Sequence, residues 1–122
     1  MRILIALALD FLFFASANTA SAVYQVVEIQ RPFTARSLSG TVLDPSGAPV
    51  PGVAVAEVDS GFHNVLATTT SDEKGHFYFP RAGLWRTHYL TFKANGFNPL
   101  RIRVNLRLFA ARSVNVKLPI GG

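Results

Sequence analysis

The side chains of this sequence that could do chemistry are a few carboxylates and three histidines. Asp44 and Asp72 each begin an Asp-x-x-Gly pattern, which is typical of a turn in which the Asp side chain caps backbone N–H groups. A calcium loop needs several alternating oxygen ligands, and neither turn supplies them. Glu57 and Asp59 are close enough to share a strand face, but we expect a carboxylate pair at a strand end to face solvent.

The histidines do not form a metal-binding or catalytic pattern. His63, His76 and His88 lack the His-x-x-Glu and His-x-x-x-His spacings that place two ligands together. The chain has no Cys and no Gly-x-Ser-x-Gly motif, so acyl transfer has no visible nucleophile. We therefore expect no enzyme activity, no metal site and no cofactor.

The residues that could form a binding surface are basic. The formal net charge is +5, and the cations are concentrated in the second half of the chain. Lys93, Arg101, Arg103 and Arg107 are the candidate contact residues, and we expect the first three on outward strand faces. A basic half indicates an anionic partner, and the alternative explanation is that these charges only keep an apolar-rich domain soluble.

Aromatic residues offer a second kind of contact. Trp85 and Tyr89 are candidates for stacking on the apolar faces of sugars. The alternative explanation for Trp85 is that it packs at the edge of the domain.

Residues 1–22 have the pattern of a secretory signal peptide. Arg2 precedes an apolar stretch, and Ala20 to Ala22 fit a cleavage site. A membrane span takes about 20 apolar residues, whereas this stretch is shorter and Asp10 interrupts it. We expect cleavage after Ala22, which leaves no transmembrane span, and retention of the segment as an anchor is the alternative. The protein is then exported, to the periplasm, the cell surface or the medium, where a protein or polysaccharide of the cell envelope is a more plausible partner than nucleic acid.

The elements that must position the candidate residues are short strands separated by Gly, Pro and Asp turns. The clearest alternation runs from Leu100 to Leu106, where aliphatic residues alternate with Arg101, Arg103 and Asn105. The expected strands are 23–29, 38–43, 53–58, 65–70, 76–79, 85–93, 100–106 and 114–118. This pattern predicts an all-β fold, a seven- to eight-stranded antiparallel β-sandwich with Greek-key connections.

The predicted organisation is a signal peptide at 1–22, a lead-in segment at 23–37 that is irregular from Gln30 to Ser37, and a single β-sandwich domain at 38–120. Without Cys, the domain must be held by its apolar core. The residues expected to face inward are Val42, Val53, Val55, Phe77, Phe79, Leu90, Phe92, Phe97, Ile102, Val104, Val116 and Leu118.

Several motifs follow one another in a specific order between Leu38 and Leu118. They are Gly40, Val42 and Asp44, then Gly47, Pro49 and Pro51-Gly52-Val53, then Asp72, Gly75, Phe77 and Phe79, and finally Gly96-Phe97. In this order and spacing the sequence resembles the carboxypeptidase regulatory-like domain, a transthyretin-like module of the wider carbohydrate-binding-like fold. His88 stands where a Tyr is usual in that family.

The resemblance implies a transthyretin- or immunoglobulin-like sandwich that serves as an accessory part. The expected function is therefore an exported, non-catalytic binding or scaffolding module of the bacterial cell envelope. Two alternatives are a carbohydrate-binding module that uses Trp85 or Tyr89, and a homo-oligomeric transthyretin-like carrier that associates through exposed strand edges.

Overall fold

The computed structural model describes residues 25–121, and the segment predicted as a signal peptide lies outside these residues. The described part is a β-sandwich that contains no helix, and so no apolar helix of membrane-spanning length. In chain order its strands are β1 (Val27–Glu28), β2 (Phe33–Ala35), β3 (Ser39–Leu43), β4 (Ala54–Val58), β5 (Val65–Thr70), β6 (His76–Tyr78), β7 (Thr87–Lys93), β8 (Leu100–Leu106) and β9 (Val114–Lys117).

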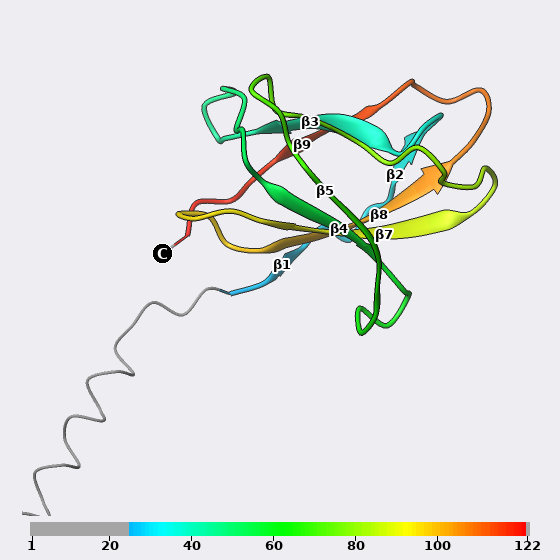
Figure 1. The fold of residues 1–122 in the computed structure, drawn as a ribbon, viewed down its shortest axis with the longest axis horizontal. Helices are drawn as coiled ribbons and strands as arrows, with labels where there is room; N and C mark the ends of the chain where they lie inside the picture. The colour runs from blue at the N-terminus through cyan, green and yellow to red at the C-terminus, as the bar shows by residue number, and fades with distance from the viewer. Residues whose placement is uncertain (1–24, 122) are drawn as a thin grey trace, which may run out of the picture.

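The strands form two sheets that stack as two layers (Figure 1). The large sheet has the order β1-β8-β7-β4-β5, and β2 also pairs with β8. The small sheet has the order β6-β3-β9. The predicted β-sandwich is therefore confirmed, and the candidate residues on β7 and β8 lie near the middle of the large sheet.

The strand count and pairing differ in detail from the prediction. Residues 25–121 contain nine strands, and the pairs β1–β8, β2–β8 and β3–β9 are parallel, so the sheets are mixed rather than purely antiparallel. Strands β1 and β2 lie one after the other along the same edge of β8. β2 falls within the segment expected to be irregular. The sequence did not predict this strand, because three residues are too few to show alternation.

The core lies between the sheets and is built mainly by the expected residues. Every residue predicted to face inward is buried except Phe97, which packs partly buried against the core. The core also includes Ala35, Leu38, Leu100, Leu106 and Val114. The burial of Ala35 shows that β2 contributes to the sandwich.

Two Asp-x-x-Gly turns connect strands as predicted. In the first, the Asp44 carboxylate accepts hydrogen bonds from the backbone N–H groups of Ser46 and Ala48, both at 2.9 Å. In the second, Gly75 has a φ of +79°, and an added Cβ would lie 2.6 Å from the carbonyl oxygen of Val42. Gly is needed there both for the left-handed backbone and for the close approach of β3.

Candidate functional site

The candidate basic residues follow the outward side of the large sheet, with Lys93 and Arg101 near one end of the β7–β8 pair and Arg107 at the other end. β7 and β8 pair antiparallel, with Tyr89 opposite Arg103 and Thr91 opposite Arg101. Leu90 and Ile102 are buried, so the alternating neighbours point away from the core. We call Lys93, Arg101, Arg103 and Arg107, together with Trp85 and Tyr89, the basic face.

Trp85 and Arg107 lie next to each other at one end of this pair of strands. The backbone N–H of Trp85 donates to the carbonyl oxygen of Leu106 at 2.9 Å. The Arg107 guanidinium lies 5.7 Å from the centre of the Trp85 ring, within the range of a cation–π contact. Trp85 has a φ of +64°, which is uncommon for a bulky residue, and its side chain is exposed.

Phe62, which is not among the candidates expected from the sequence, covers the middle of the basic face. Its ring meets Tyr89 edge-on with centroids 5.7 Å apart, and the Arg101 guanidinium lies 4.4 Å from its centre. Val58, at the end of β4, is buried although it lies outside the core cluster, and it lines the same hollow as Phe62. The loop from β4 to β5 thus places an aromatic ring over the outward side of the sheet.

The loop that carries Phe62 is held by Asp59. The carboxylate of Asp59 accepts from the backbone N–H of His63 at 2.9 Å and from the side-chain amide of Asn64 at 2.7 Å. The carbonyl oxygen of Asp59 accepts from the backbone N–H of Phe62 at 2.9 Å. These bonds hold Phe62 at a φ of +59°, and the His63 N–H bond is the largest cause of the lowered pKa of Asp59.

A hollow of about 320 Å³ lies beside Phe62 on the outward side of the large sheet. Its walls are mainly apolar, from Val26, Val58, Phe62, Val65 and Pro99 among others. Lys93 and Arg101 supply two cations to the same hollow. An apolar floor with two cations suits an anion that also carries an apolar part.

The positive charge of the basic face is not neutralised locally. Among residues 25–121, no Lys or Arg nitrogen lies within 4.0 Å of an Asp or Glu carboxylate oxygen. Arg103 instead donates to the carbonyl oxygen of Gln30 in the segment between β1 and β2. Arg101 and Arg103 therefore also hold neighbouring segments in place, whereas Lys93 is exposed.

A mostly buried titratable pair lies on the inner side of the large sheet, where His88 contacts Glu57. Their side chains are 8% and 15% exposed. The expectation that Glu57 faces solvent beside Asp59 is therefore wrong. Glu57 follows Val55 on the inward side of β4, and register brings it to β7, where His88 also faces inward.

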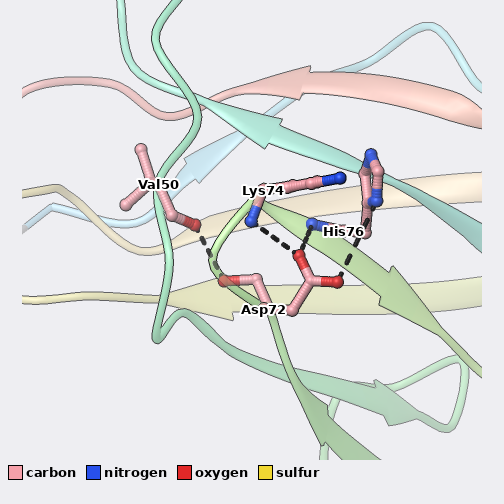
Figure 2. A network of polar contacts seen from close by, with 5 residues as sticks. Val50, Asp72, Lys74 and His76 are labelled. Carbon is pink, nitrogen blue, oxygen red and sulfur yellow. Dashed lines mark hydrogen bonds and ion pairs between the residues drawn. The ribbon is translucent and has the colours of Figure 1, made fainter.

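The carboxylates of the Asp turns are occupied by the chain's own backbone. Figure 2 shows the Asp72 carboxylate facing the backbone nitrogens of Lys74 and His76, at 2.8 and 2.9 Å. The bond from His76 is the largest cause of the lowered pKa of Asp72, and the Ser46 hydroxyl is the largest cause of the lowered pKa of Asp44. In the described part of the chain, no three His, Asp or Glu side chains are grouped so that they could hold a metal ion.

The residues that sequence reasoning missed left different traces. The alternation of Val53 and Val55 extends to Glu57, and the alternation of Phe92 and Leu90 extends back to His88. The sequence therefore contained enough pattern to predict that Glu57 and His88 both face inward. For Phe62 the only trace is an aromatic residue in a loop after Gly61, and that trace does not say which surface the ring covers.

Comparison with known proteins agrees with the resemblance seen in the sequence. The carboxypeptidase regulatory-like domain matches residues 37–119. No curated protein matches the chain by sequence. Among solved structures, 3-chlorocatechol 1,2-dioxygenase from Rhodococcus opacus 1CP aligns with 80% of this chain at 15% identity and a TM-score of 0.41, and the chain spans 62% of that structure. The carboxypeptidase regulatory-like domain is a non-catalytic β-sandwich module, and this chain belongs to that family.

Proposed function

We propose that the protein is exported and acts as a binding or scaffolding module of the bacterial cell envelope, with the basic face as its contact surface. One observation carries the proposal: four cations lie along β7 and β8 or at their ends, and none has a carboxylate partner among residues 25–121. The family supplies a module without catalytic machinery. The leader pattern at residues 1–22 supports export.

The physical reason for this choice is electrostatic. Envelope surfaces carry phosphates and carboxylates, and uncompensated cations on one face of a small domain attract and orient such groups. A guanidinium binds phosphate or carboxylate with two parallel hydrogen bonds, and the face carries three of them, from Arg101, Arg103 and Arg107.

Export is tested by expressing the full chain in a Gram-negative bacterium and fractionating the cells. We expect the protein outside the cytoplasm, with the mass of residues 23–122. Protein of unprocessed mass in the cytoplasmic fraction would refute export.

Binding is tested by mixing the exported, purified protein with isolated cell envelopes. We expect retention at low salt and release as salt rises, because screening shortens the reach of the charges. Absence of retention would refute the proposed function, and so would a hydrolase activity that disappears when one acidic residue is replaced.

The basic face gives less support to a carbohydrate-binding module. Stacking needs open aromatic rings in a row, whereas the Tyr89 ring packs against Phe62. Trp85 is then the one exposed aromatic of the two candidates. A fluorescence titration with neutral polysaccharides tests this reading, and we expect no change in the Trp85 emission.

A second candidate function, homo-oligomerisation, is favoured by β5. This strand lies at the edge of the large sheet and exposes Val65 and Leu66. An exposed apolar edge strand is a template for pairing with another chain. Light scattering of the purified protein, compared with Leu66→Lys, tests it: a dimer that the substitution disrupts supports this candidate, and a monomer in both removes it.

A further inference from the structure

One end of the sandwich exposes apolar side chains from two loops that lie side by side. Residues 79–86 connect β6 to β7, and residues 107–113 connect β8 to β9; both loops are at the right in Figure 1. The backbone N–H of Trp85 donates to the carbonyl of Leu106, and the backbone N–H of Leu106 donates to the carbonyl of Arg86. Four exposed apolar residues lie in these loops, namely Leu84, Trp85, Leu108 and Phe109.

The same loops are rich in arginine and contain no acidic residue. Arg81 and Arg86 flank Leu84 and Trp85, and Arg107 and Arg112 flank Leu108 and Phe109. Arg36 joins this end, because its backbone N–H donates to the carbonyl oxygen of Ala111 at 2.6 Å. None of these arginines lies within 4.0 Å of a carboxylate in the described residues. We call the two loops and Arg36 the arginine-rich end.

Exposed apolar groups and unpaired arginines together restrict the kind of partner. Phe109 is 91% exposed and Trp85 is 62% exposed, which leaves two large rings in water. A polysaccharide or an acidic protein surface accounts for the arginines but offers no apolar phase for the Phe109 ring. The boundary of a bilayer offers both, because Trp, Phe and Leu enter the headgroup and acyl region while arginines bind lipid phosphates.

We propose that the arginine-rich end docks on an anionic lipid surface, with Phe109 and Trp85 entering the interface. This inference deepens the proposed function, on which it rests, by naming an anionic lipid as the partner and by extending the contact surface beyond Arg107 and Trp85, which belong to both the basic face and the arginine-rich end. The stacking of Arg107 on Trp85 places a cation beside the ring that would enter the interface. The chain would bind peripherally, since four apolar side chains can reach only the outer part of a leaflet.

The experiment uses the exported, purified protein and vesicles of equal parts phosphatidylglycerol and phosphatidylcholine, with phosphatidylcholine alone as the neutral comparison. Trp85 is the only Trp of the chain, so its emission reports on this end of the molecule without labelling. We expect a blue shift and co-sedimentation with anionic vesicles, both reduced by salt, and little of either with neutral vesicles.

Matched variants distinguish docking through the arginine-rich end from non-specific adsorption to vesicles. Phe109→Ser is expected to weaken vesicle binding by about tenfold, whereas Ile120→Ser, which removes another exposed apolar side chain, leaves binding unchanged. Arg81→Glu combined with Arg112→Glu is expected to abolish the preference for anionic vesicles, and Lys74→Glu combined with Lys117→Glu, both exposed and outside this end, is the control with the same change in net charge. Because all variants share the same N-terminus, differences among them do not arise from it.

Three results would overturn the inference. The first is no blue shift with either vesicle, and the second is equal binding by Phe109→Ser and Ile120→Ser. The third is a response to soluble dextran sulfate that equals the response to anionic vesicles, which would show that this end responds to charge alone. If the protein does not bind anionic vesicles but is still retained on isolated envelopes, the inference is refuted and the proposed function stands. Loss of envelope retention alone refutes the proposed function.

Discussion

The Nδ1 atom of His88 lies 2.6 Å from Oε2 of Glu57, on the inner side of the large sheet. The other ring nitrogen of His88, Nε2, lies 2.9 Å from the carbonyl oxygen of Gly83. A carbonyl oxygen can only accept, so Nε2 is the donor of that bond. The pair therefore ties β4 to β7 and holds the loop that leads to Trp85.

Replacing one member of the His88–Glu57 pair is expected to destabilise the protein strongly, because the other member stays mostly buried without its partner. His88→Ala leaves the mostly buried Glu57 carboxylate without its partner, and Glu57→Ala does the same to the imidazole, so each is expected to lower the free energy of unfolding by about 3 kcal/mol. Denaturant unfolding of both single variants and the double variant measures the coupling. We expect the double variant to lose less than the two single losses added together, and additive losses would show that the pair is not coupled.

The Ser71 side chain is expected to contribute more to the free energy of unfolding than its small size indicates. It is buried, its hydroxyl donates to the carbonyl oxygen of Val50 at 2.8 Å, and it accepts from the N–H of Val53 at 2.8 Å. Ser71→Ala leaves both backbone groups unpaired, which we expect to cost about 1–3 kcal/mol. Ser60→Ala, at an exposed loop position, is the control, and chemical denaturation that ranks the two variants equally would contradict this role.

Gly40 is expected to tolerate no side chain. An added Cβ would lie 2.2 Å from the carbonyl oxygen of Val114, where β3 and β9 pair. A backbone atom within a sheet cannot move away cheaply, so Gly40→Ala is expected to cost about 3 kcal/mol. Gly61→Ala is the matched change, since the atoms nearest to its Cβ would be those of the movable ring of His63, at 3.0 and 3.3 Å. Equal melting temperatures for the two variants would refute the crowding at Gly40.

The Asp turns predict how stability depends on pH. Hydrogen bonds lower the pKa of Asp44, Asp59 and Asp72 below the ordinary value of 3.8. A folded-state pKa below the unfolded value stabilises the protein above about pH 4, and this contribution is lost as pH falls through the folded-state pKa values. We therefore expect the free energy of unfolding to fall steadily as the solution is acidified below that point.

Asp72→Asn tests the contribution of one turn. Asn keeps an oxygen for the N–H groups of Lys74 and His76 but does not titrate in this range. The loss of stability on acidification is expected to be shallower in this variant than in the parent. Urea unfolding measured at several acidic pH values gives both slopes, and identical slopes would exclude Asp72 as a contributor.

Local patterns in the sequence predicted much of the fold. The alternation in Leu100–Leu106 fixed which residues of β8 are buried, and the structure has this strand with the expected bounds. The Asp-x-x-Gly turns also formed as expected, because an Asp side chain finds its hydrogen-bond partners within a few residues.

Features that depend on contacts between segments far apart in the sequence could not be predicted from it. The parallel pairing of β1 and β2 with β8 involves strands of two and three residues, which carry too little pattern to show a partner. The contact of Arg101 with Phe62 depends on how the loop after β4 folds over the outward side of the sheet. The candidate basic residues could therefore be named from the sequence, but their grouping with Phe62 required the structure.

The most direct test of the basic face is a charge reversal compared on the two sheets. Lys93 ends β7 on the basic face, Lys117 ends β9 on the small sheet, and both are exposed. We expect Lys93→Glu to weaken retention on isolated cell envelopes by about fivefold or more, since a single charge near an anionic surface contributes about 1 kcal/mol. Lys117→Glu is expected to leave retention unchanged, and both variants should melt like the parent. Equal retention of Lys93→Glu and Lys117→Glu would contradict the assignment of the basic face as the contact surface.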